Sequence, residues 1–375
     1  MDAPQSLFLI YFSELEDPRL DRKKRHSLHD IIAITVCAVI AGADGWTDVE
    51  AFGQAQLTWL RAFLKLPNGI PSHDTFGRFF RLLDPVAFQT CFIRWVQALH
   101  ETVQGVVAID GKTVRRSQDE ANGKKAIHLV SAWATEAGMA LGQIKVDEKS
   151  NEITAIPELL KVLAIRGCLV TIDAMGCQRQ IAQDILDAGA DYLLAVKDNQ
   201  ETLRADVEEE FKAAQAEDFA HMDHEYYETL DKGHGRIERR QYWYTHDVAG
   251  LGTLERWPSL QGMVMCRATR TIKGKSSTED RYFITSSKDK PVKNMAASCR
   301  AHWGIENGLH WVLDVAFGED QCRIRSGYAA ENLATIRRAV VNVIKNNKSK
   351  KGGVKAKRLQ AAWNTEYLRE LFIAM

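Results

Sequence analysis

At Gly105 the spacing of apolar residues changes from the 3.6-residue period of amphipathic helices to the two-residue period of strands. Five strands are predicted, the first three in direct succession: 105–110, 126–135, 139–146, 168–173 and 192–197. A helix is predicted after each of the last three strands: 151–164, 178–188 and 201–216. This order predicts an α/β (mixed α+β) fold, in which helices pack on a mixed sheet.

The regions around this segment differ from it in pattern. Residues 1–104 have helical spacing and predict an N-terminal all-helical domain. Residues 217–290 are rich in charged and aromatic side chains and contain strand-like segments, which predicts a β-rich insertion. Helical spacing then resumes over 291–346, so we expect 105–216 and 291–346 to form one core. Residues 347–375 are expected to form a basic C-terminal tail.

The overall charge favours no polyanionic partner, because Lys+Arg and Asp+Glu both total 49 among 375 residues. Nucleic-acid binding therefore requires a local basic patch. One candidate is the stretch from Arg337 to Arg358, which holds basic residues and no acidic one. Such a run is ordinarily a solvated or disordered arm, and here it is also a phosphate-binding candidate.

The cysteines and the apolar runs indicate the compartment. Seven scattered cysteines without a CxxC pair argue against a disulfide framework and a cysteine-based zinc site. The apolar run 31–43 is shorter than the roughly 20 residues that a membrane span needs. The N-terminus lacks the pattern of a signal peptide. We therefore expect a cytoplasmic protein without a membrane segment.

A capped helix over 72–82 follows the turn-rich segment 66–71 and carries Arg78 and Arg81 on its outer face. A turn followed by such a helix is one form of DNA-recognition element. The alternative is an ordinary helical hairpin with solvated arginines. The sequence leaves both open.

The segment 299–314 predicts a helix that holds a carboxylate at the edge of the core. Glu306 lies between His302 and His310 at four-residue spacing, beside an apolar seam. The seam consists of Ile305, Leu309 and Val312. By itself this pattern is equally compatible with a structural Glu–His pair and with a metal ligand.

Two aspartates favour the metal-binding alternative. Asp110 and Asp173 each end a predicted central strand. Together with Glu306 they supply the hard oxygen ligands that Mg²⁺ or Mn²⁺ prefers. Two such ions about 4 Å apart can support an in-line phosphoryl displacement. The alternative is that each strand-end aspartate only forms a turn or caps a helix.

The chain resembles the DDE transposases of bacterial insertion sequences, most closely the group that includes the H-repeat-associated proteins. Nearly the whole chain takes part, through the segments 108–112, 148–153, 171–178, 192–200, 235–238 and 302–311, with 17–19 and 69–75 in the helical region. The resemblance implies an RNase H-like catalytic core with a β-rich insertion before the last acidic residue. It places Asp110, Asp173 and Glu306 in the catalytic, metal-binding triad.

By resemblance, the reaction is cleavage and strand transfer at insertion-sequence ends with two Mg²⁺ or Mn²⁺ ions. The implied partners are double-stranded DNA, as terminal inverted repeats and target, and a second copy of the chain on that DNA. The implied location is the nucleoid in the bacterial cytoplasm. The superfamily surrounds its glutamate with a Tyr, an Arg and a Lys, where this chain has Cys299, His302 and Leu313. His302 can still donate to a phosphate when protonated. Nearby arginines can substitute for the missing cations: Arg300, Arg323 and Arg325.

Three further residues are candidates for DNA contact. Lys112 follows the first aspartate, where a solvated turn lysine is the alternative. Lys197 and Asn199 follow a strand at the same edge, where strand capping is the alternative. Trp303 and Trp311 are expected in core or interdomain packing.

Two other functions remain compatible with the sequence. One is a transposase-derived DNA-binding or accessory protein that has lost catalysis, which the unusual His302 and Leu313 favour. The other is an endonuclease that cuts without strand transfer.

Overall fold

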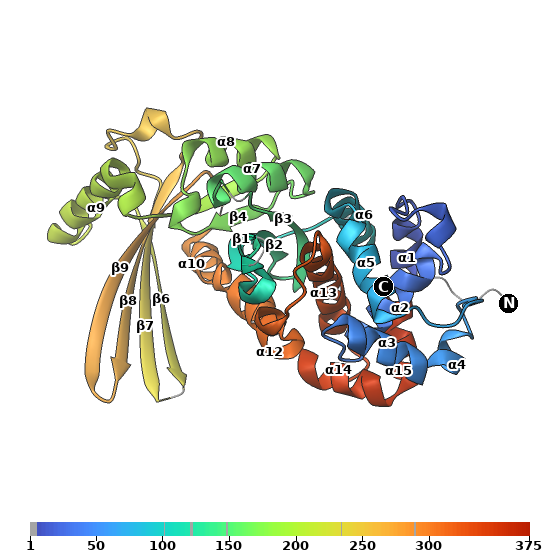
Figure 1. The fold of residues 1–375 in the computed structure, drawn as a ribbon. Helices are drawn as coiled ribbons and strands as arrows, with labels where there is room; N and C mark the ends of the chain where they lie inside the picture. Colours follow the sequence, from blue (N-terminus) through green and yellow to red (C-terminus); the bar gives the residue numbers. More distant parts are fainter. Residues whose placement is uncertain (1–5, 101, 121–122, 148, 234, 289) are drawn as a thin grey trace. The chain divides into compact units, whose positions relative to one another are not determined.

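The structure is a computed structural model that describes residues 6–100, 102–120, 123–147, 149–233, 235–288 and 290–375 (Figure 1). The four N-terminal residues used for the signal-peptide expectation lie outside this part, as does Glu148 of the family segment 148–153. Among the described residues, no helix is long and apolar enough to cross a membrane. The chain divides into two compact units. The terminal unit comprises Met1–Thr102, Gly111–Ser150 and Glu306–Met375, and the central unit comprises Val103–Asp110 and Asn151–Ile305.

The terminal unit is mainly helical. Its helices are α1 (Leu7–Phe12), α2 (Leu28–Ile40), α3 (Trp46–Ala55), α4 (Leu57–Leu60), α5 (His73–Leu82), α6 (Pro85–Leu99), α12 (Trp311–Phe317), α13 (Ala329–Asn346), α14 (Val354–Trp363) and α15 (Thr365–Ile373). It also contains the hairpin of β2 (His128–Ala134) and β3 (Met139–Lys145). Helix α13 contacts α2, α5, α6, α14 and β3, and nearly all of its residues are buried. The N-terminal and C-terminal helices therefore share one core around α13.

Local signals place the helix starts in this unit. The Ser27 side chain accepts a hydrogen bond from Asp30 N at 3.0 Å and caps α2. The Asp84 side chain accepts from Val86 N at 2.9 Å, and Pro85 occupies the first position of α6.

The central unit contains most of the sheet. Its helices are α7 (Glu152–Val162), α8 (Arg179–Asp187), α9 (Glu201–Ala216), α10 (Val292–Ala301) and α11 (Trp303–Ile305). Its strands are β1 (Val106–Thr113, through Asp110), β4 (Leu169–Ile172), β5 (Asp191–Val196), β6 (Glu225–Gly233), β7 (Arg236–Thr245), β8 (Gly262–Ile272) and β9 (Lys275–Thr285). Strands β1, β4 and β5 are parallel neighbours, and β5 pairs antiparallel with β9.

All strands belong to one nine-stranded sheet in the order β3-β2-β1-β4-β5-β9-β8-β7-β6. The predicted mixed α/β architecture, with N-terminal helices and a β-rich insertion, is therefore confirmed. The insertion adds its four strands to the edge of the sheet at β5.

The prediction of a solvated C-terminal arm is wrong. Residues 354–373 form α14 and α15, and the side chains of Lys357 and Arg358 are buried. Lys357 Nζ donates to Ile344 O at 3.1 Å, and Arg358 Nη2 donates to Val39 O at 2.8 Å. Burial lowers the pKa of Arg358 to about 10. These cations satisfy helix-end carbonyls in the core, because long basic side chains can place their polar ends there as well as in solvent.

Candidate metal centre and the buried ion network beside it

The two strand-end aspartates lie at one edge of the central unit's sheet. Ile109 of β1 pairs with Ile172 of the parallel strand β4, so Asp110 and Asp173 each follow the same pair. Carboxyl ends of neighbouring parallel strands meet at one edge, where side chains can converge on a ligand. Both aspartates are half-buried. The sequence prediction that they share an edge is consistent with this register.

Backbone hydrogen bonds fix the position of Asp173. Its Oδ1 accepts from Met175 N at 3.0 Å and from Gly176 N at 3.3 Å. Asn199 Nδ2 donates to Ala174 O at 2.6 Å and ties this turn to the end of β5. Asn199 therefore supports the loop that carries Asp173. Both hydrogen bonds use Oδ1, so Oδ2 can act as a ligand.

Glu306 begins a π-helical turn, Glu306–His310, between α11 and α12. The sequence predicts a regular α-helix here, and the π turn differs from it by its wider hydrogen bonding. Glu306 Oε2 lies 3.6 Å from His310 Nδ1, and the His310 side chain is only 6% exposed whereas that of Glu306 is 51% exposed. The apolar seam Ile305, Leu309 and Val312 is buried as predicted. It holds the turn so that Glu306 reaches the surface.

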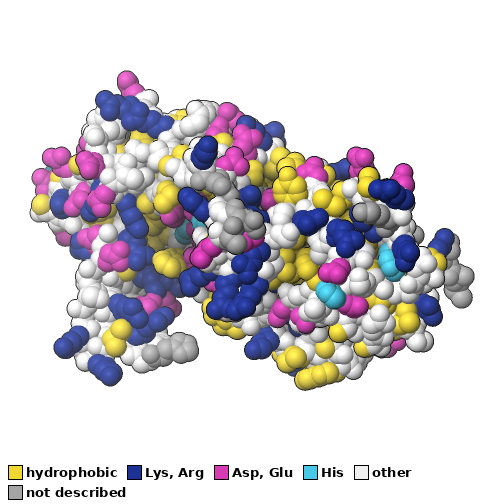
Figure 2. Space-filling model, viewed as in Figure 1, with side chains coloured by type: hydrophobic (Ala, Val, Ile, Leu, Met, Phe, Trp, Pro, Cys, Tyr) yellow, Lys and Arg dark blue, Asp and Glu magenta, His cyan; other side chains and the backbone are white. Residues whose placement is uncertain are grey.

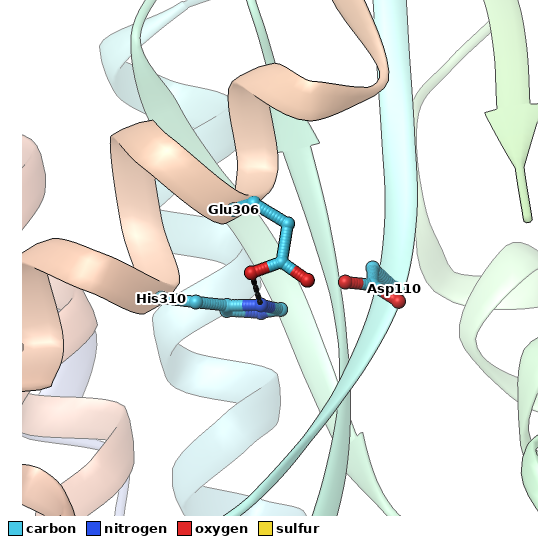
Figure 3. Close-up of side chains that lie close together, drawn as sticks. All are labelled: Asp110, Glu306 and His310. Atoms are coloured by element: carbon cyan, nitrogen blue, oxygen red, sulfur yellow. Dashed lines mark ion pairs between the residues drawn. The ribbon is translucent and has the colours of Figure 1, made fainter. Parts of the chain in front are cut away.

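Three side chains form a group with metal-ligand geometry, shown in Figure 3. One ligand atom each from Asp110, Glu306 and His310 lies within 4.8 Å of the others. In the part of the chain that the structure describes, this is the group of three that could hold an ion, and Asp173 is not a member. The sequence pattern offers His310 as a structural partner of Glu306, whereas this geometry makes it a candidate ligand. Its four-residue spacing from Glu306 was the available signal for a ligand role.

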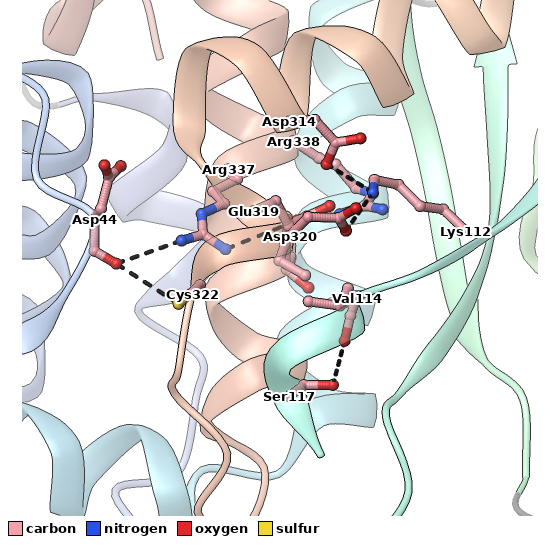
Figure 4. A network of polar contacts seen from close by, with 12 residues as sticks. Asp44, Lys112, Val114, Ser117, Asp314, Glu319, Asp320, Cys322, Arg337 and Arg338 are labelled. Atoms are coloured by element: carbon pink, nitrogen blue, oxygen red, sulfur yellow. Dashed lines mark hydrogen bonds and ion pairs between the residues drawn. The ribbon is translucent and has the colours of Figure 1, made fainter.

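The Lys112 side chain is buried and its ammonium faces two carboxylates, so the sequence reading of it as a solvated turn lysine is wrong. It is 8% exposed, and its Nζ lies 2.7 Å from Asp314 Oδ1 and 2.9 Å from Asp320 Oδ1 (Figure 4). Burial by itself would lower the pKa of Lys112, but the hydrogen bonds to the two carboxylates outweigh burial and raise it. Burial raises the pKa of Asp314, and the hydrogen bond and charge of Lys112 lower it by less. The lysine is therefore a structural cation in the terminal unit.

A second buried ion cluster lies next to Lys112. Arg338 is fully buried, and its Nη1 lies 3.4 Å from Glu319 Oε1, while Arg337 Nη1 lies 3.9 Å from the same oxygen. Burial lowers the pKa of Arg338, and Glu319 opposes that effect. These two arginines belong to the predicted basic arm but cannot contact a phosphate, because core residues surround them.

The remaining candidates for DNA contact lie at the surface. Arg300, Lys197 and Asn199 are exposed in the central unit, whereas Arg78, Arg81 and Arg323 are exposed in the terminal unit. Arg325 is half-buried and its Nη1 donates to Gln118 O at 3.2 Å. His302 is half-buried after α10. Helix α5 buries Phe76, Phe79 and Phe80, which leaves its arginines outward in agreement with both sequence readings.

The two tryptophans around Glu306 are not packed in a core. Trp303 is 54% exposed and Trp311 is 61% exposed, so the prediction of core packing is wrong. The physical reason is that the buried apolar seam consists of Ile305, Leu309 and Val312, and both tryptophans lie off it. A π turn also changes the angular spacing of the residues after it.

Comparison with known proteins assigns the family. A family model described as a transposase DDE domain matches residues 101–343, and a model described as DDE_Tnp_1-associated matches residues 9–96. The putative transposase YncI of Escherichia coli O157:H7 is 45% identical over 372 residues, covering 98% of this chain and 94% of that protein. The H repeat-associated putative transposase YhhI of Escherichia coli strain K12 is 41% identical over 365 residues, covering 96% of this chain and 95% of that protein.

Among solved structures, a piggyBac transposase synaptic complex with hairpin DNA aligns with 97% of this chain and 77% of that chain, with a TM-score of 0.41 and 11% sequence identity. The family match and the two full-length relatives determine the assignment. The chain belongs to the transposase DDE domain family.

Proposed function

We propose that this chain is a metal-dependent transposase that cleaves DNA at the ends of an insertion sequence and joins those ends to target DNA. The observation that carries the proposal is the grouping of Asp110, Glu306 and His310 within 4.8 Å. Family membership supports it independently. The proposed partners are double-stranded DNA, as terminal inverted repeats and target, and a second copy of the chain, because two ends must be processed together.

The donor set fits divalent cations. Carboxylate oxygens of Asp110 and Glu306 suit Mg²⁺ or Mn²⁺, and the imidazole nitrogen of His310 suits Mn²⁺ better than Mg²⁺. Asp173, after the neighbouring strand β4, is the proposed ligand for a second ion shared with Asp110. When bound, two such ions activate the attacking oxygen and stabilise the leaving oxygen of a phosphoryl displacement.

The chain's own groups have separate roles in this proposal. Backbone N–H groups of Met175 and Gly176 hold Oδ1 of Asp173, which keeps Oδ2 in one orientation. The half-exposed Glu306 carboxylate lies where solvent and DNA can reach it. Arg300, Arg323 and Lys197 are exposed and are the proposed contacts to DNA phosphates near the cut.

The test is cleavage of DNA that carries the ends of the element, with Mg²⁺ or Mn²⁺. Asp110→Asn and Asp173→Asn should abolish cleavage while the protein stays folded. Asp187→Asn is the matched control, because Asp187 is exposed on α8 and accepts a hydrogen bond from Gln183 at 2.8 Å. Wild-type activity in Asp173→Asn would remove that residue from the site.

Two alternative functions give different outcomes in the same assay. A nuclease without strand transfer would release cut ends but no joined product. A decayed DNA-binding protein would bind DNA without cleaving it. The protein named inactive transposase YbfQ of Escherichia coli strain K12 is 46% identical over 68 residues, which is 18% of this chain. That relative is too short to bear on the acidic residues together.

A further inference from the structure

The distal half of the insertion, formed by the ends of β6–β9 near their two hairpin turns, is exposed on both faces of the sheet. The proximal halves differ, because core residues of α10 and the aromatic side chain of Phe211 in α9 cover them. Figure 1 shows these strands extending beyond both helices. Antiparallel sheets ordinarily bury at least one face. The uncovered distal half therefore suggests a surface for a partner.

The strand register decides which side chains share a face. Arg236 pairs with Ile272, which pairs with Lys275, and two residues further along Glu238 pairs with Arg270. Alternate pairs point to the same side of a sheet. One face therefore carries the basic residues Arg236, Arg240, Arg270, Lys275 and Arg281 and the acidic residues Asp231, Glu238 and Glu279, and we call it the arginine face.

Three guanidinium groups converge on one carboxylate at this face. Arg236 Nε lies 2.9 Å from Glu238 Oε1, Arg270 Nε lies 4.0 Å from the same oxygen, and Arg240 also pairs with Glu238. Arg240 has a second partner, Asp231, at 2.7 Å. Three arginines thus share two carboxylates, which leaves an excess of positive charge. Arg236 and Arg270 remain 43% and 51% exposed, whereas Glu238 is only 17% exposed.

A shallow open hollow continues the arginine face toward the β8–β9 turn. Its lining residues are Arg270, Ile272, Lys273, Lys275, Ser276 and Ser277. They supply three cations and two hydroxyl groups and no carboxylate. Arginine, lysine and hydroxyl groups are the side chains that contact DNA phosphates. Figure 2 shows Lys and Arg side chains gathered over this end of the sheet.

The opposite face has a different arrangement of charges. Arg239 pairs with Glu228 through two hydrogen bonds of 2.8 Å each, and Arg267 pairs with Asp280 at 2.6 Å. Each of these arginines has its own carboxylate. The two faces of one sheet therefore offer an internal comparison, because three guanidinium groups meet at one carboxylate on the arginine face only.

We propose that the arginine face of the insertion binds the phosphate backbone of DNA, as a contact surface separate from the metal centre. Glu238 orders the arginines that would otherwise repel one another, and the surplus guanidinium charge is directed to solvent. The segment 235–238 marked by the family resemblance thereby has a physical role. The inference rests on the proposed function in that the polyanion is DNA.

The test uses the full-length protein in EDTA, so that metal-dependent chemistry does not contribute. Binding to a labelled duplex is measured across a range of salt concentrations. Arg270→Gln/Lys275→Gln should lower the slope of log affinity against log salt by about 2 and weaken binding at least about tenfold at moderate salt. The matched control is Lys232→Gln/Arg239→Gln, which removes two positive charges from the opposite face. It should change both quantities much less.

Equal effects of the two double variants would overturn the arginine face as a specific surface. Wild-type binding and slope in Arg270→Gln/Lys275→Gln would overturn it as well, while cleavage by the wild type would leave the proposed function standing. A changed sedimentation coefficient without DNA, with unchanged DNA binding, would show that the face joins two copies of the chain instead. No DNA binding by the wild type would defeat both proposals. Thermal melting of each variant verifies that the fold is intact.

Discussion

Two groups of charged side chains lie on the same strand, β1, and on the same helical segment, but they differ in burial and in whether they contain a cation. In the metal centre, Asp110 of β1 lies near Glu306 and His310, and Glu306 is half-exposed. Two residues further along β1, the ammonium of Lys112 lies between Asp314 and Asp320 and is buried. The second group contains its own cation. We propose that the first group takes its cations from solution.

The comparison shows how a structural carboxylate cluster differs from a candidate metal site. The structural cluster is buried around a cation of the protein itself, whereas the candidate metal site is partly exposed and has no lysine or arginine among its three residues. Both groups satisfy simple expectations for acidic residues near a sheet edge. The structural cluster is distinguished by the ion pairs of Lys112 with Asp314 and Asp320, both shorter than 3 Å. Removing one partner of a buried ion pair is strongly destabilising, whereas substitution of an exposed side chain usually changes stability by less than about 0.5 kcal/mol.

Glu306→Gln should have the largest effect on activity. The amide is nearly the same size as the carboxylate but lacks the charge that an ion needs. We expect DNA cleavage to fall on the order of 10³-fold or more, about 4 kcal/mol in transition-state stabilisation. The free energy of unfolding should stay within about 0.5 kcal/mol of wild type, because the side chain is half-exposed. A large loss of stability would show that Glu306 is structural.

Lys112→Ala should have the opposite signature. Removal of the ammonium leaves Asp314 and Asp320 close together without a cation. We expect a loss of roughly 3 kcal/mol in the free energy of unfolding, the low end for breaking a buried pair because Asp314 is about a third exposed. Urea denaturation measures this. The control is Lys161→Ala, whose exposed pair with Glu158 should leave stability unchanged. Stability equal to wild type in Lys112→Ala would remove the distinction between the two groups.

His310→Asn should affect the choice of metal more than the fold. Loss of the imidazole removes a nitrogen donor, so Mn²⁺ affinity should fall by roughly tenfold and Mg²⁺ affinity by less. Calorimetric titration of both metals gives the two ratios. Equal losses for Mn²⁺ and Mg²⁺ would argue that His310 orients Glu306 without contacting the ion.

The smallest predicted effect is on pH dependence. Burial raises the pKa of Asp314, so the folded state binds this proton more tightly than the unfolded state does, and stability from it is lost as pH rises through that pKa. In Lys112→Ala, the charged Asp314 carboxylate has no cation beside it at neutral pH, which lowers the free energy of unfolding. Protonation of Asp314 removes that charge and restores part of the stability. The stability gap between wild type and Lys112→Ala should therefore narrow by roughly 1 kcal/mol between pH 7 and pH 4.

The alkaline side provides the control for that pH experiment. The carboxylates raise the pKa of Lys112 above its ordinary value, so its stabilisation is complete below about pH 10 and is lost at higher pH. A gap that is constant from pH 4 to pH 7 would contradict the assignment of Asp314 as the carboxylate that loses its cation.

The sequence predicted the elements and the sheet edge of the site because these depend on local periodicity. Asp110 and Asp173 each follow an apolar strand, and strand ends are local features. The burial and ion pairing of Lys112 could not be predicted in the same way. Its partners Asp314 and Asp320 lie about 200 residues away, and only the fold brings them within 3 Å.

Other misreadings have the same origin. The π turn at Glu306 depends on packing of the seam, and a 100° helical projection cannot show it. Arg337 and Arg358 resemble a solvated arm in a one-dimensional charge pattern, but α13 and α14 bury them in the terminal unit. Long side chains with buried acceptors are thus the least predictable from sequence.

Calorimetric titration with Mn²⁺ tests the metal centre most directly, comparing wild type, Asp110→Asn, Glu306→Gln and the surface control Asp187→Asn. We predict saturable binding by wild type and control, with affinity at least about tenfold weaker in the two site variants. Binding by Asp110→Asn and Glu306→Gln that equals wild type, or no binding by wild type at millimolar metal, would contradict the assignment of these residues as metal ligands.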